Sequence, residues 1–276
     1  MIISLLTNGF GNNIFQCVAG KLLSIHHKVD HFFICEIKNY NCINFLESLG
    51  FKHLKNFNIN NAIVINQDKY NELFNLNIKD KTIILKGFFE DKNIYENNRD
   101  LILSFFPKVN KTNNEDLVFH FRTGDRLFYK NEFNFKPSAS SIKNAIDSFD
   151  FNNLYIVTDM YEWKEHTSET IKNLNFHVSV NPEESVDIDN AVSYYNNCFN
   201  MLQTYNPIVK NNNVLNDFNF IRSFDKILFQ HGTMSWWASF LSDASRIGVY
   251  GPWRQWKGLS NKNLSEVSFK NWFQWK

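Results

Sequence analysis

The sequence predicts an α/β protein made of two units, each with its own parallel sheet. Its 276 residues correspond to roughly two domains at about 150 residues each. Short apolar runs rich in β-branched and aromatic residues alternate with segments of helical periodicity, which is typical of a parallel sheet covered by helices. The segment 106–115 (FPKVNKTNNE) is rich in Pro, Lys and Asn and is unsuited to a core. We therefore expect a domain 1–110 and a domain 111–276.

The first unit is expected to begin with a strand, a glycine turn and a helix. Residues 2–6 (IISLL) predict the strand, two glycines break it, and apolar residues then recur at three- and four-residue steps over 13–27. A second helical stretch covers 42–49 and ends at Gly50. Further apolar runs predict strands at 31–35, 62–66 and 82–86.

The same pattern restarts after residue 115. Apolar runs predict strands at 117–121 (LVFHF), 154–158 (LYIVT), 226–229 (KILF) and 246–250 (RIGVY). A short apolar helix (WWASFL) is expected after the third of these strands. Residues 185–205 predict a longer helix, and the Asn-rich stretch 206–219 is expected to be an elaborated loop.

Composition limits the kind of protein this is. A 43% share of hydrophobic residues and 16% of aromatic residues exclude intrinsic disorder, and a net charge of +1 gives no global field for nucleic acid or an anionic membrane. Cys17, Cys35, Cys42 and Cys198 form no CxxC pair and have no His at zinc-ligand spacing. No run reaches the ~18 apolar residues of a membrane span, and the start lacks a signal-peptide pattern. We expect a cytoplasmic protein with reduced thiols, no metal and no transmembrane segment.

Ligands of open parallel sheets bind beyond the carboxyl ends of the strands, so polar residues that follow predicted strands are the candidate site residues. The turn 8–13 (NGFGNN) would bring backbone amides and a helix N-terminus close to a phosphate, although a tight connection explains it equally well. The segment 120–125 (HFRTGD) places His120, Arg122 and Asp125 at one strand end. The planar guanidinium of Arg122 suits a diphosphate. The alternatives are a surface ion pair of Arg122 with Asp125 and a buried, hydrogen-bonded His120.

Two further strand ends carry polar groups. Asp159 could accept hydrogen bonds from a base edge or from ribose hydroxyls, or it could cap a helix that starts at Met160. The hydroxyls of 232–235 (GTMS) could hold a phosphate at a helix start or cap that helix. Among the tryptophans, which gather in the last quarter of the chain, Trp253 and Trp256 are candidates to contact a sugar.

Taken in order, these segments resemble the α1,2-fucosyltransferase family of bacteria and, with an added membrane anchor, of animals. Residues 8–16 (NGFGNNIFQ) resemble its opening GGLGNQMFQ segment, and 86–90 (KGFFE) resemble its G-Y-F-Q segment. Residues 120–125 resemble its HxRRGD motif. Residues 154–163 (LYIVTDMYEW) are similar to the strand with its S-D and a later Trp, and 217–253 are similar to the stretch with STFSWW, a strand and P-x-W.

The resemblance implies a GT-B fold, in which two Rossmann-like domains face each other across a cleft, with a GDP-sugar held mainly by the second domain and the glycan acceptor on the side of the first. Arg122 would bind the diphosphate and Asp159 the guanosine. The residues carried over for donor binding are Gly11, Asn12, Arg122, Asp159, Thr233, Met234 and Ser235, of which Gly11 and Asn12 would close the cleft from the first domain.

The reaction implied is a single displacement with inversion and needs no metal or other cofactor. An acceptor hydroxyl attacks the anomeric carbon as GDP leaves, and Arg122 with helix N-termini neutralises the departing phosphates. His120 and Asp125 join Arg122 as candidate catalytic residues. Asp125, Glu90 and Asp91 are the candidates for the general base.

Four positions depart from the family motifs. Thr123 replaces the second arginine of HxRRGD, Gly232 the first Ser of STFS, Met234 its Phe, and Glu90 the Gln of G-Y-F-Q. We expect transfer of L-fucose from GDP-fucose to a galactose-like glycan residue through an α1,2 bond, with no nucleic-acid partner. Because Thr123 stands where the family has an arginine, one positively charged hydrogen-bonding group is missing, and another GDP-linked deoxyhexose is an alternative to GDP-fucose. The Trp-rich end leaves a non-catalytic carbohydrate-binding protein as a third.

Overall fold

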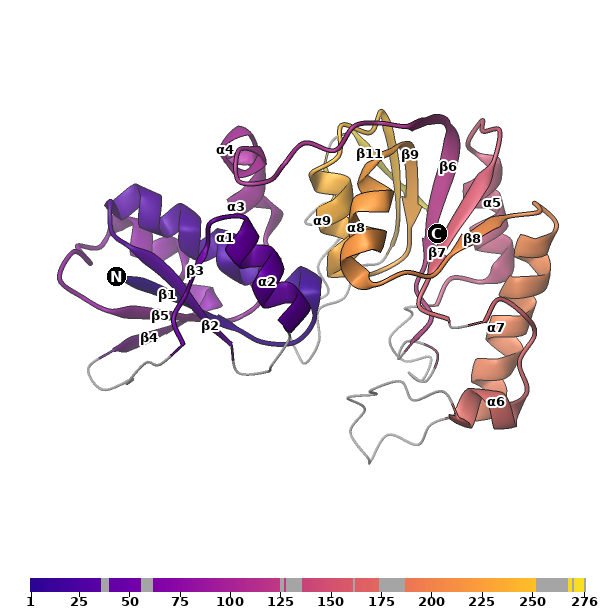
Figure 1. Cartoon of the computed structure of the whole chain (residues 1–276), viewed down its shortest axis with the longest axis horizontal. Coiled ribbons are helices and arrows are strands. Elements are labelled where there is room, and N and C mark those ends of the chain that lie inside the picture. The colour runs from indigo at the N-terminus through magenta and orange to yellow at the C-terminus, as the bar shows by residue number, and fades with distance from the viewer. Residues whose placement is uncertain are drawn as a thin grey trace. The chain divides into compact units, whose positions relative to one another are not determined.

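The computed structural model divides the chain into two compact units, Met1–Lys108 (unit 1) and Val109–Lys276 (unit 2), and the division falls within the segment predicted to be a linker. Each unit holds one sheet of parallel strands with helices against it, which confirms the predicted α/β class (Figure 1). The structure describes residues 1–35, 40–55, 62–124, 127, 136–160, 162–173, 187–251, 268–269 and 271–275.

The sheet of unit 1 has the strand order β3-β2-β1-β5-β4, and its strand pairs are parallel. Its strands are β1 (Ile2–Leu6), β2 (His31–Cys35), β3 (Lys52–His53), β4 (Ile63–Asn66) and β5 (Ile83–Lys86). Its helices are α1 (Phe10–His27), α2 (Tyr40–Ser48), α3 (Lys92–Glu96) and α4 (Arg99–Leu103), with the 3₁₀ turns η1 (Gln67–Lys69) and η2 (Asn71–Asn75).

Helix α1 packs directly on the centre of this sheet. A Cβ on Gly20 would come within 2.2 Å of Ser4 Oγ and 2.4 Å of His31 Nε2, so only glycine allows this approach. The apolar side of α1 meets buried side chains of β1 and β5, each of which contributes about 1.5–3 kcal/mol when fully buried. The buried residues of this core are Ile2, Ala19, Leu23, Tyr70, Leu73, Ile78, Ile83, Leu85 and Phe89.

The sheet of unit 2 has the strand order β11-β10-β9-β6-β7-β8, again with parallel pairs. Its strands are β6 (Asn113–Phe121), β7 (Leu154–Thr158), β8 (Ile208–Lys210), β9 (Phe224–Phe229), β10 (Arg246–Tyr250) and β11 (Trp272–Trp275). Its helices are α5 (Ala139–Asp147), α6 (Ser168–Asn173), α7 (Ile188–Gln203), α8 (Val214–Arg222) and α9 (Thr233–Phe240).

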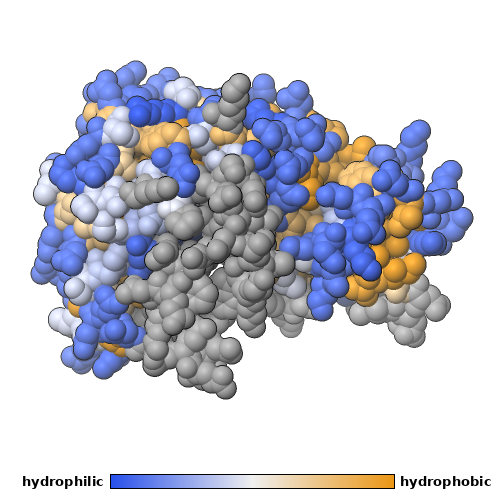
Figure 2. All heavy atoms as spheres, turned by 180° about the vertical axis from the view of Figure 1, so that it is seen from behind, coloured by the Kyte–Doolittle hydropathy of each residue, from blue (hydrophilic) through white to orange (hydrophobic). Residues whose placement is uncertain are grey.

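Helices cover both faces of this sheet. Helices α5 and α7 lie on one face and α8 and α9 on the other (Figure 1). Trp236 and Trp237 of α9 are 1% and 0% exposed, so this tryptophan pair belongs to the core. On the outside, hydrophilic residues alternate with smaller hydrophobic areas over the face shown in Figure 2.

The structure corrects the sequence prediction at several elements. The stretch 206–219, expected to be a loop, contains strand β8 and most of helix α8. Helix α1 begins at Phe10 rather than Asn13, so the first glycine turn is shorter than predicted. Strands β3, β8 and β11 were not predicted; β3 and β8 have two and three residues, too few for a period to be visible.

Candidate functional site

The chain of unit 2 changes direction at β6. From β6 it moves outward to β7 and β8, returns to β9 on the other side of β6, and continues to β10 and β11. The connections that follow β6 and β9 therefore diverge at the carboxyl edge of the sheet. In open α/β sheets this switch point is where ligands bind. Of the predicted site segments, 120–125 begins with the last two residues of β6, and 232–235 comes shortly after β9.

Arg122 and Gly232 meet at this switch point. Arg122 follows the last residue of β6 and is half-buried. A Cβ on Gly232 would lie 3.6 Å from both Cδ and Nη1 of Arg122 and 3.6 Å from Ser235 Oγ, so the arginine side chain lies alongside the start of α9. Gly232 has a φ of +151°, a conformation that residues with a Cβ rarely adopt.

Helix α9 begins at this point without a side-chain cap in the described part of the chain. Gly232 is the N-cap residue and supplies no side chain, and the hydroxyl of Ser235 hydrogen-bonds Nδ1 of His120 instead of the helix start. The alternative in which the hydroxyls of 232–235 cap the helix is therefore wrong. The first N–H groups and the positive end of the helix dipole suit an anion.

The three residues carried over from this helix start are not equally exposed. Thr233 is half-buried, whereas Met234 and Ser235 are 9% and 0% exposed. Only the backbone of the latter two is suited to a ligand, because their side chains are enclosed.

His120 is buried beneath the site, with 5% of its surface exposed. Burial, together with the nearby Arg122, lowers the pKa of His120 from 6.5 to about 4, although Asp159 acts in the opposite direction. The imidazole is therefore neutral at neutral pH, and its Nδ1 forms a hydrogen bond with the hydroxyl of Ser235. This contact fixes the start of α9 against the end of β6. The catalytic role of His120 stays a prediction.

Asp159 follows β7 and is exposed. Its Oδ1 accepts hydrogen bonds from the backbone N–H of Thr123 at 2.8 Å and from the Thr123 hydroxyl at 2.7 Å. Its Oδ2 lies over Gly124, where an added Cβ would come within 2.2 Å. The alternative in which Asp159 caps a helix is wrong, because residue 160 and residues 162–167 are not helical.

Thr123 is a site residue that sequence reasoning missed. It is 0% exposed, and its hydroxyl also lies 3.3 Å from Thr158 Oγ1. The sequence showed only that a threonine replaces an arginine of the related motif. The register of β6 with β7, which pairs Phe121 with Thr158, brings the two strand ends together and explains why a small hydroxyl residue fits between them.

The corresponding region of unit 1 is organised by Gln16. Its Nε2 donates to Thr7 Oγ1 at 2.9 Å and to the Gly87 carbonyl at 3.0 Å, and its Oε1 accepts from the Thr7 N–H at 3.0 Å. These bonds join the carboxyl ends of β1 and β5. Asn8 and Phe89, near those two ends, have φ angles of +64° and +55°. Such strain at non-glycine residues is common at ligand sites.

The predicted residues of unit 1 lie close to this region. Gly11 and Asn12 are the second and third residues of α1; Gly11 is buried and Asn12 is half-buried. Asn12 Oδ1 is buried without a hydrogen-bond partner among the described residues. That Gly11 and Asn12 contact a GDP-sugar stays a prediction. Glu90 and Asp91 follow β5, and Asp91 caps α3 through the N–H of Asn93.

Three predicted residues, Asp125, Trp253 and Trp256, lie outside the described residues. Within the described residues, no group of three or more His, Cys, Asp and Glu side chains is placed to hold a metal ion. Over the same residues, none of the helices is long and apolar enough to cross a membrane.

Comparisons of the chain with protein-family models, with curated proteins and with solved structures found no match.

Proposed function

We propose that this chain is an inverting, metal-independent glycosyltransferase that moves L-fucose from GDP-fucose to a hydroxyl of a galactose-like glycan residue, through an α1,2 bond. The observation that carries the proposal is the position of Arg122 against Gly232 at the start of α9. A guanidinium and a helix N-terminus at a switch point offer the charge and the donors that a nucleoside diphosphate needs. The guanosine and the fucose come from the motif resemblance.

Each residue of the site has a separate task in this proposal. The planar fork of Arg122 binds oxygens of the diphosphate, and the first N–H groups of α9 bind others. Asp159 presents Oδ2 to N–H groups of the guanine or to ribose hydroxyls, while Thr123 holds Oδ1 in place. His120 positions the helix start through Ser235.

The chemistry is one displacement at the anomeric carbon. The acceptor oxygen forms a bond to this carbon, and the bond to the GDP oxygen breaks with its electron pair passing to the phosphate. The hydroxyl proton passes to a base, for which Asp125, Glu90 and Asp91 are the candidates. Negative charge grows on the diphosphate, so Arg122 and α9 bind the transition state more strongly than the ground state.

Donor turnover tests the proposal. The full chain is incubated with GDP-fucose and a panel of galactosides, without metal and with EDTA, and released GDP is measured. Arg122→Ala is expected to lower kcat by about 10²-fold or more, because it removes charge stabilisation from the transition state. Arg122→Lys keeps the positive charge but lacks the planar fork of donors, so its kcat is expected to lie between those of Arg122→Ala and the unaltered chain. Lys143→Ala is the matched control, because it removes an exposed cation that pairs with Asp147 on α5.

Four results would contradict the proposal or replace its donor. A strict need for a divalent ion, or an Arg122→Ala variant with full activity, argues against it. Turnover of a different GDP-deoxyhexose in preference to GDP-fucose changes the sugar but keeps the site. Glycan binding without any affinity for GDP favours the carbohydrate-binding alternative.

A further inference from the structure

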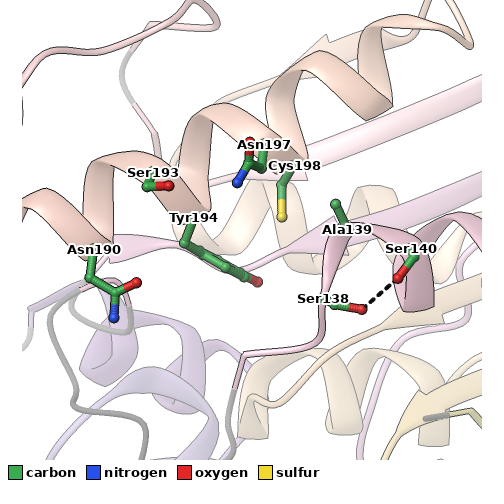
Figure 3. Close-up of a pocket in the computed structure, with 8 residues that line it drawn as sticks. All are labelled: Ser138, Ala139, Ser140, Asn190, Ser193, Tyr194, Asn197 and Cys198. Carbon is green, nitrogen blue, oxygen red and sulfur yellow. Dashed lines mark hydrogen bonds between the residues drawn. The ribbon is translucent and has the colours of Figure 1, made fainter.

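A cavity of about 500 Å³ lies between α5 and α7 in unit 2 (Figure 3). This volume is within the range of about 300–1,000 Å³ that small-molecule sites occupy. Its lining comes from the start of α5 and from the first two thirds of α7. The lining residues are Ser138, Ala139, Ser140, Asn190, Ser193, Tyr194, Asn197 and Cys198.

The contribution of α7 is a single face of that helix. Asn190, Ser193, Tyr194, Asn197 and Cys198 follow one another at steps of three, one, three and one residues, so they share one side. Asn190, Ser193 and Asn197 are exposed, and their side chains form no hydrogen bond with the described part of the chain. Two amides and one hydroxyl are therefore ready to donate to a ligand and to accept from it.

The start of α5 forms the opposite wall. The Ser138 hydroxyl caps α5 by accepting from the N–H of Ser141, and it lies 2.9 Å from the hydroxyl of Ser140. Tyr194 extends from α7 toward this wall, as Figure 3 shows. Its ring supplies an apolar surface between two polar walls.

The lining carries no net charge at neutral pH. Burial raises the pKa of the Tyr194 hydroxyl and raises that of the Cys198 thiol to about 12, so both stay protonated. The other lining residues are Ser, Asn and Ala. Lys136 is not among the lining residues; its Nζ lies 5.6 Å from the centroid of the Tyr194 ring and is hydrogen-bonded to the Leu127 carbonyl. A lining of amides, hydroxyls and one aromatic ring suits an uncharged ligand with many hydroxyls and an apolar face.

The cavity lies at the same edge of the sheet as the switch point. Helix α5 follows β6 and α7 precedes β8, so both helices start at the carboxyl edge. The Tyr194 hydroxyl is 3.4 Å from Nε2 of Gln230, which directly follows β9 and is two residues before Gly232. Through Tyr194, the cavity thus contacts the β9–α9 connection, at whose end the proposed phosphate site lies.

We propose that this cavity binds one uncharged sugar ring of a glycan, at a site separate from that of the nucleotide. Amides and hydroxyls of α7 and α5 bind the sugar hydroxyls, and Tyr194 packs against a C–H face of the ring. The resemblance places the reacting end of the acceptor on the side of the first unit, so the cavity would hold a different sugar ring of the same glycan. The link to the acceptor rests on the proposed function, whereas binding of the sugar itself does not depend on it.

Binding of free sugars without nucleotide tests the inference. Galactose, fucose, N-acetylglucosamine and lactose are titrated into the full chain, with saturation-transfer NMR and calorimetry as the readouts. At least one is expected to bind with a millimolar dissociation constant. Ser193→Trp places a large side chain in the cavity and is expected to weaken binding by about tenfold or more. Asn197→Ala is expected to weaken it less, because it removes only hydrogen bonds.

The matched control is Gln203→Trp, which puts the same side chain on an exposed position of α7 away from the cavity. This variant and Arg122→Ala are expected to bind the sugar as the unaltered chain does. Absence of saturable binding by every sugar of the panel overturns the inference. So does binding that Arg122→Ala abolishes and Ser193→Trp spares, because the sugar then occupies the nucleotide site.

The two proposals fail in different ways. Sugar binding that Ser193→Trp removes, in a chain without affinity for GDP, supports the cavity and refutes the transferase. GDP-fucose turnover with no sugar bound at the cavity supports the transferase and refutes the cavity.

Discussion

The buried imidazole of His120 makes the stability of unit 2 depend on pH. Its pKa falls from 6.5 to about 4 on folding, mainly because burial disfavours the charged form. Between these two values the unfolded chain binds more protons than the folded one. The stability is therefore fully present above pH 6.5 and is lost as the pH falls toward 4, by on the order of 3 kcal/mol for this group.

Urea unfolding at about pH 7.5 and about pH 4.5 measures this effect. His120→Gln is expected to lose less free energy of unfolding between the two pH values than the unaltered chain, because its side chain does not titrate. His26→Gln, at an exposed position, is the control and is expected to keep the original dependence. Equal losses in His120→Gln and the unaltered chain would show that the imidazole does not resist protonation.

Two glycines at the start of helices differ sharply in what they tolerate. Gly232→Ala forces a side chain into a φ of +151° beside Arg122, and we expect a loss of about 1–3 kcal/mol in the free energy of unfolding together with weaker GDP binding. Gly9 has a φ of −82°, and an added Cβ would meet nothing within 4 Å. Gly9→Ala is therefore expected to change the free energy of unfolding by no more than about 0.5 kcal/mol.

Urea unfolding and GDP calorimetry on both variants distinguish the two sites. An unaffected Gly232→Ala variant would mean that the start of α9 can relax, and the proposed phosphate site would lose its main geometric support.

Residue types at the strand ends could be predicted from the sequence, but their contacts could not. Arg122 and Asp159 were recognised because each is a charged residue that directly follows a predicted apolar strand. The hydrogen bonds from Thr123 to Asp159 depend on which strands are neighbours, and the local pattern contains no such information. For the same reason the sequence left open whether the hydroxyls of 232–235 cap α9 or hold a phosphate, and it gave no sign that the Ser235 hydroxyl bonds to His120 on β6.

At the scale of the elements, helix α8 starts where the side chain of Asn213 caps it. Oδ1 of Asn213 accepts a hydrogen bond from the N–H of Asn216 at 3.0 Å. Asn213→Ala is expected to cost about 1 kcal/mol in the free energy of unfolding, because an N–H group of the first turn loses its partner. Asn152→Ala, in an exposed turn, is the control and is expected to change little. Equal values for both variants would remove the cap as the reason for the helix start.

The same helix shows why an element was mistaken for a loop. Three asparagines directly precede the helix and two lie within it, and this residue type lowers helix propensity and favours turns. Phe218 and Ile221 are nevertheless fully buried against the sheet, and this packing outweighs propensity. Strands β1, β2, β7 and β10 were predicted with their observed bounds, because each is a short, mostly apolar run between breaks.

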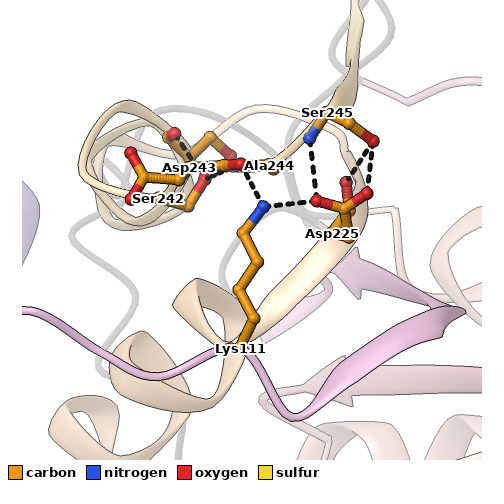
Figure 4. A network of polar contacts seen from close by, with 7 residues as sticks. Lys111, Asp225, Ser242, Asp243, Ala244 and Ser245 are labelled. Carbon is orange, nitrogen blue, oxygen red and sulfur yellow. Dashed lines mark hydrogen bonds and ion pairs between the residues drawn. The ribbon is translucent and has the colours of Figure 1, made fainter.

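At the scale of the whole molecule, Lys111 anchors the start of unit 2 (Figure 4). Its Nζ contacts Oδ1 of Asp225 and the carbonyl of Asp243, and Asp225 also accepts from the N–H of Ser245 at 3.1 Å. Burial would raise the pKa of Asp225, but hydrogen bonds from Lys111 and Ser245 outweigh it and lower the pKa. These contacts join β6, β9 and β10 at the amino edge of the sheet, opposite the candidate site.

Lys111→Met is expected to cost about 1–3 kcal/mol in the free energy of unfolding, because it leaves a half-buried carboxylate without its cation. Lys52→Met is the control. The side chains of Lys52 and its partner Asp30 are 62% and 66% exposed, and we expect this variant to lose less than about 1 kcal/mol in the free energy of unfolding. A double-mutant cycle with Asp225→Asn isolates the pair. A coupling energy of zero would show that Lys111 and Asp225 act independently.

The adjacency of β6 and β9 also sets the order of events while the protein is being synthesised. His120 and Ser235, which hold the two connections together, are 115 positions apart in the chain. A nascent chain that has released only β6, β7 and β8 has an open edge on β6 and does not yet contain α9. The proposed nucleotide site is therefore complete only after the ribosome has delivered α9, and until then the open edge of β6 needs protection from other chains.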